Sequence, residues 1–150
     1  MQLPDAEQLL TQLIEKIRPD IAGNTAIVGI HTGGAWLARR IHQALEIVLP
    51  VGVLDISFYR DDYSKIGLHP QVRPSQLPFD AENSHIILVD DVLYTGRTVR
   101  AAVNELFDYG RPASIDLAVL VDRGGRELPI AARYTGEVLT LPENSMLELR

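Results

Sequence analysis

The chain has 150 residues, of which 46% are hydrophobic and 23% charged, and its formal net charge is −6. This length and balance are typical of one soluble globular domain covering residues 1–150. The acidic charge argues against an overall cationic nucleic-acid binder, although it is compatible with a local basic face. Without cysteine the chain has no disulfide and no cysteine-based metal or redox site. We expect no membrane span and no secretory signal, and therefore a cytoplasmic protein.

The expected elements of the first half alternate between helices and strands. Asp5 and Gln8 look like a capping box that begins a first helix, and Arg18-Pro19 should end it. Residues 60–80 contain three prolines and show no periodicity, which predicts a long irregular connection. Between these segments, apolar spacing predicts a strand at 26–30, a turn at 31–34, a helix with Leu37, Ala38, Ile41, Leu45 and Val48 facing inward, and a strand at 51–59.

The second half continues the alternation. It should contain a buried strand at 86–89, an amphipathic helix that Gly110 and Pro112 stop, a strand at 114–121 and a weaker strand at 138–141. Strands alternating with helices predict an α/β fold, a single domain with a mostly parallel sheet flanked by helices. Ligands in such sheets bind beyond the carboxyl ends of the strands. The turns at 31–34, 90–98 and 122–126 should therefore lie along one edge.

The turn after the 86–89 strand is the strongest functional candidate. Residues 95–98 stand where a strand ends and a helix begins, so free backbone N–H groups and the helix dipole favour an anion there. Asp90 and Asp91 come just before this turn, although their charge would repel a phosphate. They make sense if the ligand also carries hydroxyls or a bound cation, as a sugar phosphate with Mg²⁺ does. The alternative is an ordinary polar turn of an α/β protein.

Four β-formers, two acids and a Thr-Gly-x-Thr turn in one run resemble the signature of type I phosphoribosyltransferases for 5-phosphoribosyl-1-pyrophosphate (PRPP). The resemblance implies that Asp90 and Asp91 hold the ribose hydroxyls and take part in catalysis, and that residues 95–98 cradle the 5′-phosphate. It also implies Mg²⁺ bound with PRPP, and we assign no protein side chain to this metal. The implied PRPP-binding residues are Asp90, Asp91, Val92, Thr95, Gly96, Arg97 and Thr98.

A second strand-to-helix turn comes earlier in the chain, at His31, Thr32, Gly33 and Gly34. Two glycines in a turn by themselves indicate only tight turning. Beside the first site, the turn would offer a second anion position, and type I enzymes use such a loop for the pyrophosphate of PRPP. A histidine in this setting is more often a hydrogen-bonding turn residue than a catalytic base.

Residues 60–80 have two interpretations. From physical grounds alone they form a solvated surface loop or a β-hairpin. The resemblance instead implies a flexible loop that closes over the substrate and shields the reaction from water. In that interpretation Arg60 is a catalytic residue that stabilises charge on the leaving group. The other loop residues that it implies are Asp61, Asp62, Lys65 and Arg73.

The segment at 121–130 narrows the resemblance. Its Val-Asp-Arg-Gly-Gly-Arg-Glu-Leu-Pro-Ile string is similar to one in the pyrimidine operon regulator and uracil phosphoribosyltransferase family (PyrR), as are 55–62, 89–100 and 110–115. The resemblance covers roughly residues 26–136. It implies a base pocket at Val121, Asp122 and Arg123, built largely from backbone groups.

Two positions depart from that family. Gly33 stands where the family typically has an arginine in the pyrophosphate loop, and Gly125 replaces a common histidine. The first change removes a cation expected near pyrophosphate, so catalytic efficiency is in doubt.

Three functions follow from the resemblance. The first is an enzyme that joins uracil to PRPP and forms UMP and pyrophosphate, as a homodimer or higher homo-oligomer. The second is a UMP-dependent regulator of pyrimidine biosynthesis genes that acts by mRNA attenuation. The third is a catalytically weak UMP or PRPP sensor that acts through RNA or a protein partner. A basic patch for RNA would draw on Arg18, Arg39, Arg40, Arg111 and Arg133.

Overall fold

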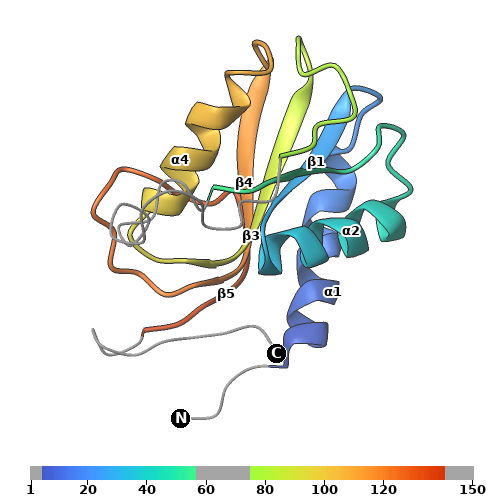
Figure 1. The fold of residues 1–150 in the computed structure, drawn as a ribbon. Helices are drawn as coiled ribbons and strands as arrows, with labels where there is room; N and C mark the ends of the chain where they lie inside the picture. Colours follow the sequence, from blue (N-terminus) through green and yellow to red (C-terminus); the bar gives the residue numbers. More distant parts are fainter. Residues whose placement is uncertain (1–4, 57–74, 141–150) are drawn as a thin grey trace.

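The computed structural model describes residues 5–56 and 75–140 (Figure 1). The predictions at Arg60, Asp61, Asp62, Lys65 and Arg73 lie outside these residues. The described helices and strands, in chain order, are α1 (Ala6–Ile17), a 3₁₀ turn η1 (Arg18–Asp20), β1 (Thr25–Ile30), α2 (Gly33–Leu45), β2 (Gly52–Leu54), β3 (His85–Leu93), α4 (Arg97–Leu106), β4 (Ser114–Asp122) and β5 (Tyr134–Val138).

The five named strands form one parallel sheet in the order β2-β1-β3-β4-β5. This confirms the predicted α/β fold. β2 and β3 lie on opposite sides of β1, so the strand order reverses between β1 and β3. The loops after these two strands therefore border the crevice where ligands of open α/β sheets bind.

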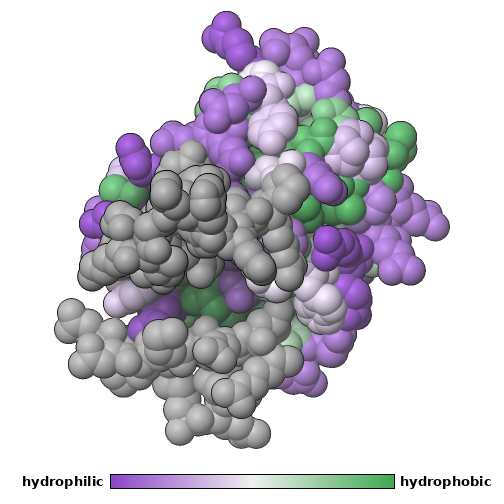
Figure 2. Space-filling model, viewed as in Figure 1, coloured by the Kyte–Doolittle hydropathy of each residue, from purple (hydrophilic) through white to green (hydrophobic). Residues whose placement is uncertain are grey.

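Helices cover both faces of the sheet (Figure 1). One buried cluster joins α1 and α2 to side chains such as Ile27, Ile87 and Leu120. A second cluster joins α4 to Val28, Leu88 and other side chains on the opposite face. Burial on both faces accounts for the unbroken apolar run at the start of β3. In the view of Figure 2, hydrophilic side chains cover most of the described surface, with smaller apolar patches between them.

The two helices on the first face are also joined by charge. The Asp5 carboxylate caps α1 by accepting from the Glu7 amide at 3.0 Å, and Pro19 lies in η1 just beyond the end of this helix. Glu7 in turn accepts two hydrogen bonds from Arg40 of α2, both at 2.9 Å. The helix start predicted at Asp5 is confirmed, and so is the stop before Pro19. Within the described residues, no helix is long and apolar enough to cross a membrane.

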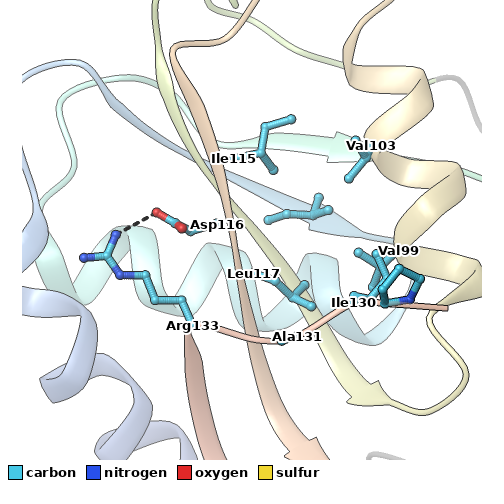
Figure 3. A pocket seen from close by; sticks show the side chains of 10 residues that line it. Val99, Val103, Ile115, Asp116, Leu117, Ile130, Ala131 and Arg133 are labelled. Atoms are coloured by element: carbon cyan, nitrogen blue, oxygen red, sulfur yellow. Dashed lines mark hydrogen bonds and ion pairs between the residues drawn. The ribbon is translucent and has the colours of Figure 1, made fainter. Parts of the chain in front are cut away.

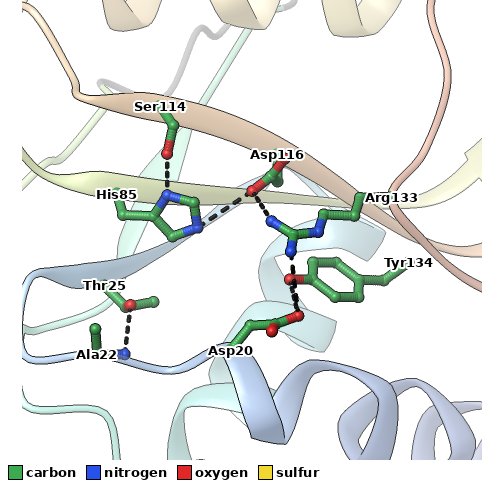
Figure 4. Close-up of polar contacts among 8 residues, drawn as sticks. All are labelled: Asp20, Ala22, Thr25, His85, Ser114, Asp116, Arg133 and Tyr134. Atoms are coloured by element: carbon green, nitrogen blue, oxygen red, sulfur yellow. Dashed lines mark hydrogen bonds and ion pairs between the residues drawn. The ribbon is translucent and has the colours of Figure 1, made fainter.

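A polar network lies at the amino end of β4 (Figure 4), whereas the predicted base pocket lies at the carboxyl end of this strand. Arg133 donates to Asp116 at 2.9 Å and reaches Asp20 at 3.5 Å. His85 contacts Asp116 through Nε2 at 3.1 Å and Ser114 through Nδ1. The Tyr134 hydroxyl donates to Asp20 at 2.8 Å. The network therefore links η1, β3, β4 and the start of β5.

Several element boundaries differ from the sequence predictions. Val48 is 82% exposed rather than inward, because Glu46 adopts a left-handed conformation (φ 51°) that ends α2 at Leu45. β3 continues through Asp90 and Asp91 because its pairing with β4 extends to Leu93. β5 lies at Tyr134–Val138 instead of 138–141. A Cβ at Gly136 would lie 2.5 Å from the Leu120 carbonyl oxygen, so the missing side chain permits this close strand pairing.

Candidate active site

The 31–34 loop and the end of β3 lie against each other at the carboxyl edge of the sheet. Thr32 is the N-cap of α2, and the His31 amide donates to the Leu54 carbonyl at 2.9 Å. A Cβ at Gly34 would lie 2.3 Å from the Val89 carbonyl oxygen, and one at Gly33 would lie 2.5 Å from Asp91 Oδ2. The two glycines thus let the first turn of α2 approach the backbone and carboxylate of β3.

The two carboxylates sit on the last residues of β3 in different surroundings. Asp90 is 7% exposed, and its Oδ1 accepts from the Asp91 amide at 2.8 Å. Asp91 is less buried, and its Oδ1 accepts from the Val92 amide at 2.8 Å. Successive side chains of a strand point to opposite faces, so Asp91 faces α2 while Asp90 faces the side of α4. Each carboxylate can accept hydrogen bonds from hydroxyls of a ligand at this edge of the sheet.

The 95–98 turn begins α4 as expected. Gly96 is the N-cap with φ 97°, a left-handed conformation that a residue with a side chain rarely adopts. The Thr95 hydroxyl accepts from the Arg97 amide at 3.2 Å, and the side chains of Arg97 and Thr98 are exposed. Amides at the start of a ten-residue helix point outward here, which suits an anion.

The 122–130 segment lies along this turn. The Thr95 carbonyl accepts from the amides of Glu127 at 2.9 Å and Leu128 at 3.2 Å. The Glu127 carboxylate also accepts from Arg97 Nε at 2.7 Å. Gly96 packs against Ile130, because a Cβ there would lie 3.0 Å from Ile130 Cγ1. All three predicted turns therefore share one edge of the sheet.

Arg126 holds this arrangement together through its side chain, whereas the sequence predicted only that its turn, 122–126, lies at this edge. Its Nη2 donates to Asp122 Oδ2 at 2.5 Å, its Nη1 to the Tyr94 carbonyl at 3.0 Å and its Nε to the Ile130 carbonyl at 2.8 Å. Partial burial alone would raise the pKa of Asp122. The hydrogen bonds from Arg126 and the Gly124 amide, with the charge of Arg126, outweigh burial and lower that pKa below its ordinary value.

Tyr94 is a second residue that was not predicted. This residue is 37% exposed, and the guanidinium carbon of Arg123 lies 4.1 Å from its ring centroid, in cation–π geometry. Gly125 has φ 78°, and a Cβ there would lie 2.4 Å from Tyr94 Cε1. The ring therefore occupies space that a larger residue at position 125 would need.

The residues of the predicted base pocket do not all offer side chains. Val121 is 4% exposed and belongs to the core under α1 and α2, so only its backbone is available to a ligand. Arg123 is 8% exposed and lies over Tyr94, while Asp122 is bound to Arg126. The side chains of these residues are thus engaged within the protein, and the base pocket stays a prediction.

Two further features border the site. Trp36 of α2 is 41% exposed, its amide donates to the Thr32 carbonyl at 3.3 Å, and the Arg40 guanidinium lies 5.0 Å from its ring centroid. Among the residues described, no group of three or more His, Asp or Glu side chains could hold a metal ion.

A hollow of about 230 Å³ lies elsewhere, between α4, β4 and residues 129–133 (Figure 3). Its lining is mainly apolar, with Val99 and Ile130 on one side and the Arg133–Asp116 pair on the other. None of the predicted site residues lines it. It is therefore a separate feature of the α4 face.

Comparison with known families agrees with this geometry. Residues 2–140 match the phosphoribosyl transferase domain, and the chain therefore belongs to the phosphoribosyltransferase family. Among curated proteins, the bifunctional protein PyrR of Nitrosococcus oceani is 56% identical over 143 residues, which cover 94% of this chain and 81% of that relative. The bifunctional protein PyrR of Pseudomonas paraeruginosa is 50% identical over 153 residues, covering 99% of this chain and 90% of the relative. Within the phosphoribosyltransferases, the chain belongs to the PyrR proteins.

Solved structures support the same fold. A hypoxanthine phosphoribosyltransferase from Staphylococcus aureus superposes with a TM-score of 0.72 at 22% identity, covering 97% of this chain and 80% of that one. A purine phosphoribosyltransferase from Pyrococcus horikoshii gives 0.68 at 24% identity, covering 97% and 93%. At these identities the likeness concerns the fold. The resemblance found in the sequence is confirmed at both levels.

Proposed function

We propose that this protein transfers the 5-phosphoribosyl group of PRPP to uracil, forming UMP and pyrophosphate. One observation carries the proposal: Asp90 and Asp91 stand between two helix N-termini, those of α2 and α4, at the carboxyl edge of one sheet. A ribose with a phosphate at one end and pyrophosphate at the other needs this alternation of anion sites and hydroxyl acceptors. Membership among the PyrR proteins supports uracil as the base.

In this proposal each part of the site has a role in positioning. The carboxylates of Asp90 and Asp91 accept from the ribose hydroxyls, the 95–98 turn binds the 5′-phosphate, and the 31–34 loop binds pyrophosphate through its backbone. Backbone groups at 121–123 meet the base. Positive charge grows on the ribose as pyrophosphate leaves, so alignment and charge stabilisation supply most of the catalysis.

The metal belongs to the substrate in this scheme. Mg²⁺ prefers oxygen ligands and retains waters, and it binds through one or two carboxylates and substrate phosphates. Asp90 and Asp91 are two adjacent carboxylates that fit this pattern, and Mg²⁺ would supply charge neutralisation for the diphosphate. Arg60, with Lys65 or Arg73, remains our proposal for the cations that assist the leaving group.

Loss of PRPP binding tests the assignment. Asp91→Asn and Thr95→Ala should each weaken the Kd for PRPP with Mg²⁺ by about tenfold or more, because each removes a hydrogen-bonding group at the ligand. Calorimetry measures this, with Asp116→Asn at the opposite end of β4 as the matched control. Unchanged affinity in both variants would overturn the assignment.

A second experiment identifies the base that the protein accepts. The protein is incubated with PRPP, Mg²⁺ and either uracil or hypoxanthine, and UMP is the expected sole product.

We also propose a regulatory role through mRNA, which the resemblance to the pyrimidine operon regulator family supports. The contacts of the arginines in the structure change which of them are good candidates for binding RNA. Three of the five suggested for a basic patch are paired with carboxylates: Arg18 with Glu15, Arg40 with Glu7, and Arg133 with Asp116. Arg39 and Arg111 are therefore the better candidates. A salt-dependent gel shift with UMP present should favour pyrimidine-operon leader RNA over a scrambled RNA, and equal binding would exclude specific recognition.

A sensor with weak catalysis is the remaining candidate, and Gly33 is the residue that favours it. An arginine at position 33 would add a cation for pyrophosphate, yet its Cβ would stand 2.5 Å from Asp91 Oδ2 and would push that carboxylate aside. A sharp rise in UMP formation by Gly33→Arg would favour the sensor. A fall would show that the absence of a side chain at Gly33 is needed to keep the Asp91 carboxylate in place.

We also propose a homodimer or higher homo-oligomer and a cytoplasmic enzyme. Light scattering with and without UMP would test the oligomeric state.

A further inference from the structure

We propose that Arg126 is a positioning residue that fixes the 95–98 turn relative to the end of β4. In this way it aligns the ribose phosphate with the base. The inference rests on the proposed function, since it concerns the two halves of that same substrate site. The sequence placed Arg126 only within the 122–126 turn and gave its side chain no role.

The geometry of Arg126 differs from that of a simple ion pair. Its three donor nitrogens reach three separate segments: the Asp122 carboxylate at 2.5 Å, the Tyr94 carbonyl at 3.0 Å and the Ile130 carbonyl at 2.8 Å. Asp122 ends β4, Tyr94 directly precedes the 95–98 turn, and Ile130 packs against Gly96 within it. A single planar group thus ties a strand end, a turn and the segment that covers the turn.

Other contacts also join the 95–98 turn to the 122–130 segment, and they differ from those of Arg126 in their exposure to solvent. The Glu127 and Leu128 amides bind the Thr95 carbonyl, and Glu127 pairs with Arg97, so the turn is also fastened to the middle of the 122–130 segment. The Arg97–Glu127 pair is exposed, with side-chain exposures of 72% and 53%, and such pairs stabilise little. Arg126 and Asp122 are better shielded, at 25% and 18%. Arg123 also lies over the Tyr94 ring, but Arg126 is the shielded side chain that hydrogen-bonds both the Tyr94 carbonyl and the Asp122 carboxylate of β4.

Only an arginine can make this connection. The guanidinium is a rigid fork whose N–H groups point in several fixed directions, whereas a lysine ammonium is a compact charge on a flexible stem. Arg126→Lys keeps the charge beside Asp122 but cannot reach both carbonyls and the carboxylate in their present positions. If Arg126 only neutralised Asp122, lysine would serve equally well.

The consequence for the reaction is alignment. Phosphoribosyl transfer requires the base and the ribose carbon to meet within reacting distance, and a misplacement of about 1 Å can cost about 100-fold in rate. We therefore expect Arg126→Lys and Arg126→Gln to lower kcat by about 100-fold, while the Kd for PRPP with Mg²⁺ weakens by less than about tenfold. Arg133→Lys is the matched control, because Arg133 also pairs with a carboxylate of β4 but at the other end of the strand.

The experiment measures UMP formation, PRPP affinity by calorimetry, and amide hydrogen exchange at Glu127 and Leu128. The expected result is a kcat loss that lysine does not rescue, faster exchange at these amides, and normal kcat for Arg133→Lys. Normal kcat in the Arg126 variants with only a lower Tm, or full rescue by lysine, would overturn the inference. If the unaltered protein formed no UMP, the proposed function would fail instead, and unchanged exchange in the variants would then refute the positioning role independently.

Discussion

Strand β4 carries an arginine–carboxylate network at each end, and the two networks are built differently. At the amino end, Arg133 contacts the side chains of Asp116 and Asp20, whose other partners are His85 and Tyr134 (Figure 4). At the carboxyl end, Arg126 contacts one carboxylate and two loop carbonyls. The first network joins regular elements to one another, whereas the second sets the shape of loops. We infer that one end of β4 maintains the fold and the other maintains the site.

The largest expected effect is at Gly34, where one substitution should impair both the fold and the site. A Cβ there would lie 2.3 Å from the Val89 carbonyl oxygen, and backbone cannot move aside as a flexible side chain can. Gly34→Ala should therefore shift the first turn of α2 from β3, lower UMP formation by about 100-fold, and cost about 1–3 kcal/mol of unfolding free energy. Steady-state kinetics and urea denaturation measure the two effects.

The control for this substitution is Gly23→Ala, because a Cβ at Gly23 would meet no atom within 4 Å. It should leave both the rate and the stability close to those of the unaltered protein. Normal activity in Gly34→Ala would mean that the contact between α2 and β3 is not required for the site.

Asp116→Asn should separate fold from site at the other end of β4. The substitution weakens the contacts with Arg133 and His85, and the Asp116 side chain is only 22% exposed, so we expect a loss of about 1–2 kcal/mol in unfolding free energy. The kcat of the folded enzyme should not change. A large loss of kcat at unchanged Tm would show that the amino-end network also acts on the reaction.

The smallest expected effect is a pH dependence at Tyr134. Burial, followed by the hydrogen bond to Asp20, raises the pKa of Tyr134 to about 12. A folded-state pKa above the unfolded value of about 10 means that this tyrosine stabilises the fold below pH 10, and that the contribution is lost as the pH rises toward 12. Tyr134→Phe should cost about 1 kcal/mol at neutral pH and flatten the loss of stability over that alkaline range. Urea denaturation as a function of pH measures both, and an equally steep decline in the phenylalanine variant would refute the assignment.

Local patterns in the sequence predicted one part of the site well. The apolar start of β3, the glycine at position 96 and the apolar spacing of α4 all lie within one short run, and the structure shows a left-handed Gly96 followed by the helix at Arg97. The arrangement of the three turns along one edge also followed from the alternation of strands and helices. The roles of Asp90, Asp91 and the 95–98 turn remain predictions that the binding experiment tests.

Other parts depend on contacts that no local pattern records. Besides Asp122, Arg126 binds two backbone carbonyls, and any residue type can supply a carbonyl, so these two partners leave no mark in the sequence. The Tyr94 ring occupies space that the absence of a side chain at Gly125 leaves open. Gly125 is 31 positions away in the sequence and was noted only as a departure from the family. The boundary of β5 was missed because Gly136 lacks the side chain that strand patterns rely on, although this absence allows the backbone to approach Leu120.

The position of Trp36 gives the molecule an optical property. It is the sole tryptophan of the chain, it is partly exposed on the first turns of α2, and its amide is bonded to Thr32 in the 31–34 loop. The stacked Arg40 guanidinium places a positive charge near the indole, and an anion arriving at the loop would change the electric field that the ring experiences. We therefore expect the emission of this one indole to report, without any label, on anion binding at the 31–34 loop, the proposed pyrophosphate position.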